Sequence, residues 1–364
     1  MFHKIKVLFA KKMIWFFSKK PKLKGSNYEH DLDNLKIFFL QHSGINYAFH
    51  SVSRVISKKR DKWVGGQDYK ENCIFIPNDE NRFLIGDKLL GISLNSDERF
   101  KWTGGCVFEN TLYCFPRSSP YFLFYKDGEI GLFPVLKSSK GEHHYGGVCT
   151  EDGVVYQPPR NSNYILKTNL KTKEVIKIFI TPFFLKIGLR YCGSIIHPNG
   201  LIYFLPENNK VIVLDPKTDK WSFIGKCIIG MAFDAKVGID GNIYGFSAYG
   251  KGILKINVET NVVEKIHDGV YFGAFGTKYG LNGILYSVPG QGENVWSFDV
   301  SRGSLQIAFS IKNNSKVKFA GGCTCKNGSI AFAPAEEDYV LCMEPDTKIG
   351  FPDTIYNLFI QDFY

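Results

Sequence analysis

The stretch that decides the fold reads Tyr191-Cys-Gly-Ser-Ile-Ile-His-Pro-Asn-Gly-Leu-Ile-Tyr203-Phe-Leu-Pro206 and continues as Val211-Ile-Val-Leu-Asp-Pro-Lys-Thr218. It contains a doublet of small residues, an Asn-Gly turn and an apolar strand that includes Tyr203. A proline follows three residues after that tyrosine, and a second strand ends in Asp-Pro-x-Thr. Internal repetition of such a unit is the strongest fold signal a sequence carries, so the rest of the chain was compared with this stretch.

Seven copies of the unit appear when the chain is aligned on the residue equivalent to Tyr203. The aligned residues are Ile74, Tyr113, Tyr156, Tyr203, Tyr244, Tyr286 and Ala331. Successive copies are 39, 43, 47, 41, 42 and 45 residues apart, and six of them have proline three residues after the aligned position. A period of about 43 residues with four short strands is the length of one propeller blade. The sequence therefore predicts an all-β, seven-bladed β-propeller.

Turn residues support this prediction independently. A Gly-Gly doublet occurs in four copies, at Gly65-Gly66, Gly104-Gly105, Gly146-Gly147 and Gly321-Gly322. Five copies carry an Asp-Gly or Asn-Gly pair before the aligned strand, at Asp152-Gly153, Asn199-Gly200, Asp240-Gly241, Asn282-Gly283 and Asn327-Gly328. We interpret these pairs as two-residue turns in which both residues take positive φ. They would join adjacent antiparallel strands.

The repeats divide the chain into three parts. We expect an N-terminal arm with a short helix over residues 1–45, the propeller over residues 46–350 and a C-terminal tail over residues 351–364. A propeller ring closes by pairing strands from the two ends of the chain. We predict that Ser51–Ser57 completes the seventh blade, and Ile355–Ile360 is the competing closing strand.

The repeats resemble those of kelch-type β-propellers. The Gly-Gly doublets and the segment Val213-Leu-Asp-Pro-Lys-Thr-Asp-Lys-Trp221 carry the resemblance, which spans about residues 60–348. The trailing tryptophan occurs only in the fourth copy, and the doublet is missing from copies five and six. The resemblance implies a kelch-like propeller with a binding role, and it implies no particular activity.

The net charge of +10 belongs mainly to the N-terminal arm, because residues 1–24 contain eight lysines and no acidic residue. On a helical wheel several aromatic residues of this arm share one side, as in an interfacial helix on anionic lipid. A helix packed on the propeller, a disordered basic tail and nucleic-acid binding are the alternatives, and the arm has no recognised nucleic-acid motif. The predicted membrane-binding residues are Phe2, Lys4, Phe9, Lys11, Lys12, Trp15, Phe16, Lys19 and Lys20.

The sequence contains no secretion signal and no membrane-spanning stretch, and its cysteines form no cluster. The apolar runs of the arm are too short for a secretion signal, and no stretch is long enough to span a bilayer, so we expect a cytoplasmic, peripheral membrane protein. Nine scattered cysteines favour reduced thiols over a disulfide framework. Cys323 and Cys325 form an isolated C-x-C, so neither a metal site nor a cofactor is expected.

Two series of basic residues are predicted to meet on one rim of the ring. One series stands three residues before each doublet, at Lys62, Lys101, His143, Arg190 and Lys318, and Arg117 and Arg160 follow the repeat proline. Aromatic neighbours of the first series would pack between blades while the basic side chains reach the central funnel. The rim would then bind an anionic ligand, an anionic glycan or a protein partner, through its arginines. The alternative is that these charges are solvated loop residues.

The function predicted from the sequence is non-catalytic binding at a membrane surface, with cell-envelope polysaccharide assembly as a conceivable setting. A first alternative is a glycan lyase or hydrolase that works in the funnel, with His143, His144 and Tyr145 as candidate catalytic residues. A second alternative is a protein-interaction scaffold. Nucleic acid is the least favoured partner.

Overall fold

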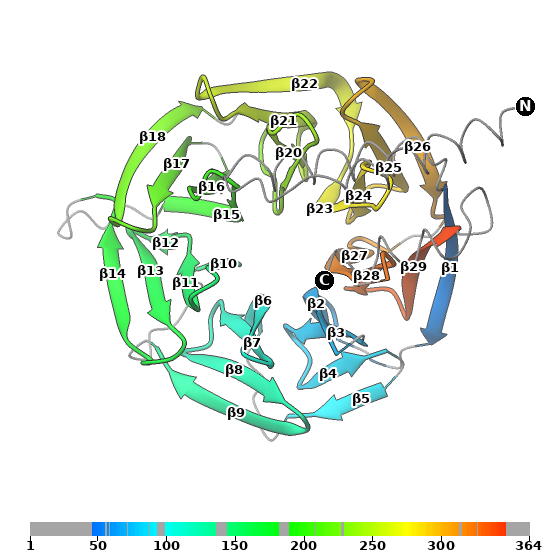
Figure 1. The fold of residues 1–364 in the computed structure, drawn as a ribbon. Coiled ribbons are helices and arrows are strands. Elements are labelled where there is room, and N and C mark those ends of the chain that lie inside the picture. Colours follow the sequence, from blue (N-terminus) through cyan, green and yellow to red (C-terminus); the bar gives the residue numbers. More distant parts are fainter. Residues whose placement is uncertain are drawn as a thin grey trace, which may run out of the picture.

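The computed structural model describes a closed ring of seven β-sheets arranged around one axis (Figure 1). It describes residues 46–346 except for gaps at 55–56, 58, 71, 87, 93–98, 136–143, 182–188, 208, 227–228, 313–314 and 326. Within these residues every regular element is a strand, and none is a helix that could cross a membrane. The predicted arm, its short helix and the C-terminal tail lie outside the described residues.

Each blade is an antiparallel sheet whose strands follow one another from the axis to the periphery. The first blade contains β2 (Trp63–Tyr69), β3 (Asn72–Pro77), β4 (Arg82–Ile85) and β5 (Lys88–Gly91). The second contains β6 (Trp102–Phe108), β7 (Thr111–Pro116), β8 (Tyr121–Lys126) and β9 (Glu129–Pro134). The third contains β10 (Val148–Cys149), β11 (Val154–Gln157), β13 (Tyr164–Asn169) and β14 (Val175–Phe179). The fourth contains β15 (Leu189–Ile196), β16 (Ile202–Pro206), β17 (Lys210–Asp215) and β18 (Lys220–Lys226), and β12 (Arg160–Ser162) is an extra strand beside β15. The fifth contains β19 (Lys236–Val237), β20 (Ile243–Phe246), β21 (Lys251–Asn257) and β22 (Val262–Tyr271). The sixth contains β23 (Ala274–Tyr279), β24 (Leu285–Pro289), β25 (Asn294–Asp299) and β26 (Ser304–Ser310). The seventh contains β27 (Phe319–Thr324), β28 (Ile330–Pro334), β29 (Tyr339–Asp346) and β1 (Asn46–Arg54).

The sequence repeat and the blades coincide, which confirms the predicted fold class. All seven aligned residues, from Ile74 to Ala331, lie in the second strand of their blade. The five Asn-Gly or Asp-Gly pairs lie between the first and second strands, as predicted. The prediction that they form two-residue turns with positive φ at both residues was wrong. In the fourth blade the amide of Gly200 donates to the carbonyl of His197, and only the glycine has positive φ, at 86°. The pair therefore ends a four-residue turn, and the Asn199 side chain accepts a hydrogen bond from the amide of Leu201.

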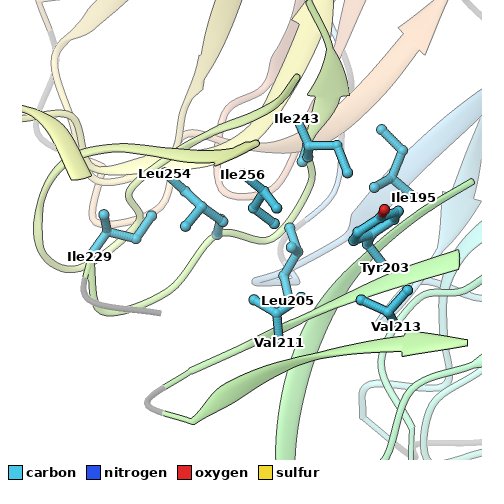
Figure 2. Packing of buried hydrophobic residues seen from close by; sticks show 11 residues of the cluster. Ile195, Tyr203, Leu205, Val211, Val213, Ile229, Ile243, Leu254 and Ile256 are labelled. Carbon is cyan, nitrogen blue, oxygen red and sulfur yellow. The ribbon is translucent and has the colours of Figure 1, made fainter. Parts of the chain in front are cut away.

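Apolar side chains fill the wedge between neighbouring blades. Figure 2 shows the interface of blades four and five, where Tyr203 and Leu205 meet Ile243 and Ile256. The predicted interblade aromatics occupy the same kind of site, because Trp63, Trp102, Tyr191 and Phe319 are all buried. Complete burial of one such side chain contributes about 1.5–3 kcal/mol. The core of the protein is thus a ring of seven similar interfaces.

The innermost strands approach one another so closely that only glycine fits. A Cβ atom on Gly321 would lie 3.0 Å from the Cα of Gly65, and a Cβ on Gly65 would lie 3.1 Å from the Cα of Gly104. Gly65, Gly104, Gly146 and Gly321 also share a positive φ of 66–79° at a β-bulge or loop that opens the inner strand. The doublets are therefore the points at which neighbouring blades touch around the axis.

An N-terminal strand closes the ring. β1 pairs with β29 in antiparallel register from Asn46 opposite Asp346 to Arg54 opposite Tyr339. The prediction that an N-terminal segment completes the seventh blade is confirmed, although the strand begins five residues before Ser51 and ends at Arg54. The competing strand at Ile355–Ile360 lies outside the described residues.

A disulfide joins the first and the seventh blades. Cys73 of β3 is bonded to Cys323 of β27 across 250 residues of sequence. The expectation that every cysteine is a reduced thiol was wrong here. Sequence spacing gave no sign of this pair, because the two cysteines become neighbours only when the last blade meets the first.

Alanine substitutions test the role of the glycine contacts. Gly321→Ala combines an unfavourable φ with a clash against Gly65, whereas Gly146→Ala has the same φ problem but nothing within 4 Å of the new Cβ. We expect G146A to lose about 1 kcal/mol of unfolding free energy and G321A to lose distinctly more, of the order of 3 kcal/mol. Gly91→Ala, which has open space and ordinary φ, is the control. Equal losses for G321A and G146A in urea unfolding would contradict a steric role.

Candidate functional site

The face on which the innermost strands begin carries the predicted basic residues, and we call this face the mouth. The second strand of each blade ends on the same face, so the residues after each repeat proline also lie there. Arg117 follows β7, and Arg160 follows Pro159 at the start of β12. Residues of several blades therefore converge on a single rim, as the repeat predicts.

Two arginines of the mouth lie against one tyrosine ring. The guanidinium carbon of Arg117 is 4.7 Å from the ring centroid of Tyr145, and that of Arg160 is 5.4 Å from it. Arg117 also stacks on Phe100 at 4.2 Å. A cation over an aromatic face is stabilised by the ring quadrupole, and the ring fixes the plane of the guanidinium. The structure thus brings together Arg117 of blade two, Tyr145 of blade three and Arg160, which stands on β12 at the edge of blade four.

A third arginine joins this group through strand pairing. β12 adds an extra strand to the fourth blade, and its Arg160 stands directly opposite Arg190 of β15. Opposed residues of antiparallel strands project from the same face, where like charges repel. Glu207 balances part of this charge, because one of its oxygens lies 3.5 Å from Arg190 Nη1. Three guanidinium groups therefore occupy one sector of the mouth.

Aromatic side chains form a floor beside the arginines. Tyr145, Phe233 and Phe275 occupy the position of Val64 in their own blades, and the Phe233 centroid lies 5.2 Å from Tyr145 and 4.9 Å from Phe275. Tyr249 packs on both phenylalanines and remains 51% exposed. Burial raises the pKa of Tyr145 to about 12, although Arg117 and Arg160 act in the opposite direction. Tyr145 is therefore a neutral phenol at ordinary pH.

The predicted lysines do not reach the funnel, and this part of the prediction was wrong. Lys62, Lys101 and Lys318 are all at least 97% buried. Lys62 Nζ donates to the carbonyls of Glu336 and Glu337 in the seventh blade, at 3.1 and 2.7 Å. Lys101 Nζ donates to the carbonyl of Asp79 in the first blade, and Lys318 Nζ donates to that of Ser315. In the first two blades the repeated lysine links one blade to its neighbour.

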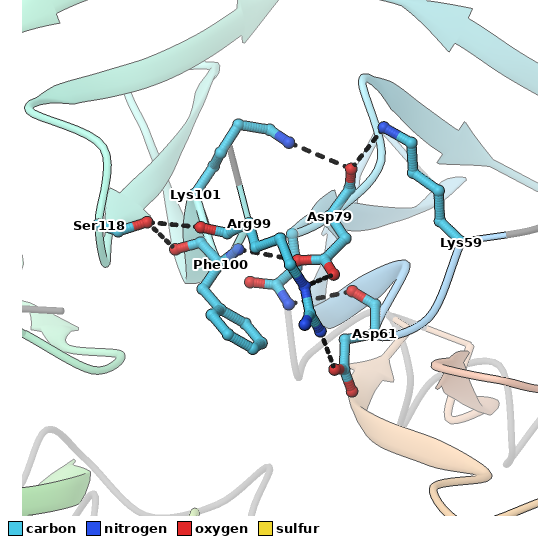
Figure 3. Close-up of polar contacts among 8 residues, drawn as sticks. Lys59, Asp61, Asp79, Arg99, Phe100, Lys101 and Ser118 are labelled. Atoms are coloured by element: carbon cyan, nitrogen blue, oxygen red, sulfur yellow. Dashed lines mark hydrogen bonds and ion pairs between the residues drawn. The ribbon is translucent and has the colours of Figure 1, made fainter. Parts of the chain in front are cut away.

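In the sector of the mouth between blades one and two, unlike the sector of Arg117 and Arg160, an arginine is paired with carboxylates (Figure 3). Arg99 contacts Asp79 at 2.8 Å and Asp61 at 3.2 Å. Burial, and next the charge of Asp79, raise the pKa of the Asp61 carboxyl. Here the carboxylates outnumber the arginine that pairs with them, so the arginine-rich sector is confined to blades two to four.

His144 is not placed for catalysis in the funnel. His144 takes the interblade position that Trp63 and Trp102 occupy in their blades; it is 1% exposed and its Nδ1 lies 3.1 Å from the carbonyl oxygen of Pro158. Its ring packs on Tyr164, so it points away from the axis. His143 lies outside the described residues. Tyr145 alone of the three candidate catalytic residues is shown facing the mouth.

A central channel of about 560 Å³ lies behind the aromatic floor. All seven inner strands line it, and its walls reach Val107, Ile196 and Thr324, next to the turns of the opposite face. Two lysines in the channel wall share one carboxylate, because Lys278 Nζ and Lys236 Nζ lie 3.4 and 3.6 Å from the oxygens of Asp234. Burial lowers the pKa of Lys278. These residues were not predicted from the sequence because copies five and six lack the glycine doublet.

Known protein structures resemble this chain in fold, but no protein family could be assigned to it. The chain is similar in structure to a streptogramin B lyase, with 13% identity, a TM-score of 0.67 and coverage of 83% of this chain and 98% of that chain. Virginiamycin B lyase from Staphylococcus aureus gives 11% identity, a TM-score of 0.68 and coverage of 82% and 99%. The extracellular domain of a hybrid two-component system from Bacteroides thetaiotaomicron gives 14% identity and a TM-score of 0.62, covering 84% of this chain and 42% of that chain.

These neighbours define the class of protein, a seven-bladed β-propeller, and they are not specific to the kelch type. No protein-family model matches the chain, and no curated protein sequence matches it significantly.

Substitution of Lys101 separates its structural role from a ligand-binding role. Lys101→Met removes one of two donors to the Asp79 carbonyl, since Lys59 Nζ also donates to it at 3.0 Å, so we expect the free energy of unfolding to fall by about 1 kcal/mol. Lys126→Met, on an exposed residue of β8, is the control and should change stability by less than about 0.5 kcal/mol. Unchanged stability of K101M in chemical denaturation would show that the buried contact is unimportant.

Proposed function

We propose that this propeller is a non-catalytic binding module whose mouth holds an anionic ligand, with an acidic glycan as the favoured class. The observation that carries the proposal is the convergence of Arg117 and Arg160 on the ring of Tyr145, with Arg190 opposite Arg160. Guanidinium groups bind carboxylates and phosphates through paired hydrogen bonds. Clustering like charges costs stability, and an anion between them offsets that cost.

The aromatic floor supports a sugar as the ligand. Tyr249 is the most exposed ring of the floor and lies beside Phe233 and Phe275. An exposed ring offers an apolar face to a pyranose, while the arginines hold its carboxylate. A binding role also agrees with the kelch-type resemblance of the repeats.

Charge reversal at the mouth tests the proposal. We expect wild-type protein to bind polygalacturonate and not dextran, with affinity that falls as salt increases. Arg117→Glu and Arg160→Glu should each weaken binding about 10- to 100-fold, since a hydrogen bond to a charged group contributes about 1.5–3 kcal/mol. Isothermal titration measures the affinity, after circular dichroism has shown that each variant is folded.

Arg302→Glu provides the matched control, because the substitution makes the same change in net charge and Arg302 is 72% exposed on an outer turn. Polygalacturonate binding that is equal in R160E and R302E would contradict the proposed site. Conversion of the polysaccharide to unsaturated or shortened products by the wild type would instead favour the lyase or hydrolase alternative.

We further propose that the N-terminal arm holds the propeller on an anionic membrane surface on the cytosolic side. The support is its composition, eight lysines with interspersed Phe and Trp in residues 1–24. Each lysine near such a surface contributes about 1 kcal/mol.

Removal of residues 1–24 tests this tether. We expect the full chain to co-sediment with phosphatidylserine-containing vesicles at low salt and not with purely phosphatidylcholine vesicles, and we expect the truncated chain to remain in the supernatant. Co-sedimentation of the truncated chain at the wild-type level would end the tether hypothesis.

A further inference from the structure

Three cysteine sulfurs meet where the last blade contacts the first. The sulfur atoms of Cys73, Cys323 and Cys325 all lie within 4.8 Å of one another. Cys323 and Cys325 are two residues apart at the end of β27, and their sulfurs are 3.6 Å apart. Alternate residues of a strand project from the same face, so both thiol groups face the first blade, from which Cys73 projects. No feature of the mouth depends on this cluster.

The spacing of the three sulfurs suits metal coordination. A metal–thiolate bond of about 2.3 Å with tetrahedral or trigonal angles places neighbouring sulfurs about 3.8–4.0 Å apart. The distance between Cys323 and Cys325 is already close to this value, and Cys73 is within reach of both. Asp68 stands opposite Cys73 in the β2–β3 pair, which adds a carboxylate on the same face of the sheet.

We propose that Cys73, Cys323 and Cys325 form a binding site for a thiophilic metal ion, Zn²⁺ or Cu⁺, in the reduced protein. Soft thiolate ligands select these ions. In the structure Cys73 and Cys323 share a disulfide, so loading begins with reduction by a thiol reductant. Two reductant thiols become one disulfide, and the protein disulfide becomes two thiols. Coordination then releases one proton from each of the three thiols to solvent.

Reduction leaves the ring closed, which keeps the site assembled. β1 pairs with β29 through eight residue pairs, so the seventh blade is completed without the disulfide. Cys323 is buried, and Cys73 and Cys325 are half-buried at the edge of the same apolar cluster, so the surrounding protein holds all three in place. The metal and the disulfide are therefore alternative links between the same two blades.

Cadmium titration of the full chain tests the site, because Cd²⁺–thiolate bonds absorb in the ultraviolet and Cd²⁺ replaces Zn²⁺ at such sites. Protein reduced with a phosphine and desalted without oxygen should bind one Cd²⁺ per chain with a charge-transfer band. Untreated, disulfide-bonded protein should show no band. Cu⁺ binding in competition with a bathocuproine chelator should follow the same pattern.

Cys325→Ser is the decisive variant, because it keeps the Cys73–Cys323 disulfide and so does not threaten folding. We expect it to lower the affinity for Cd²⁺ and Cu⁺ at least 100-fold after reduction. Cys149→Ser is the matched control, since it removes a half-buried thiol beside Cys106 between blades two and three. Absence of a band in reduced wild type, or equal binding by C325S and wild type, would overturn the proposal.

Discussion

The structure depends on how closely its inner strands approach one another. A Cβ atom on Gly65 would lie 3.1 Å from the Cα of Gly104, and a Cβ on Gly321 would lie 3.0 Å from the Cα of Gly65, so neither glycine leaves room for a side chain between neighbouring blades. These contacts hold the first blade close to the second and to the seventh, and the same positive φ opens each of these strands at a bulge. The residue before each of these glycines then projects into the ring, as do Tyr145, Phe233 and Phe275. Two of these three aromatic residues, Tyr145 and Phe275, stand directly before a glycine with positive φ.

The chemistry of the mouth comes from loops that the repeat holds at equivalent positions but fills with different residues. The residue after the repeat proline is Arg117 in blade two, Arg160 in blade three's copy and Glu207 in blade four. In blade one the acidic Asp79 follows two residues after the proline and pairs with Arg99. The mouth therefore has one sector where Arg99 is paired with Asp61 and Asp79 and another where Arg117 and Arg160 share the ring of Tyr145, so a symmetric scaffold obtains an asymmetric binding surface.

The repeat made most of the fold predictable. The anchor residues and the positions of the turns between the first and second strands were found from spacing, because each blade encodes its own strand pairing locally. The N-terminal closing strand was found because a propeller ring closes by pairing the two ends of the chain. The convergence of Arg117 and Arg160 also followed from topology. The burial of Lys62, Lys101 and Lys318 did not, because it depends on neighbouring loop carbonyls. The Cys73–Cys323 bond was missed because it joins the first blade to the last, and the Lys236–Asp234–Lys278 group was missed because copies five and six lack the glycine doublet.

A crystal structure of the full chain with a short galacturonate oligosaccharide is the most direct measurement of the central claim. The account predicts a uronate carboxylate between the guanidinium groups of Arg117 and Arg160, with the sugar ring against Tyr249. A ligand bound on the opposite face, or in the channel beside Lys236 and Lys278, would contradict it.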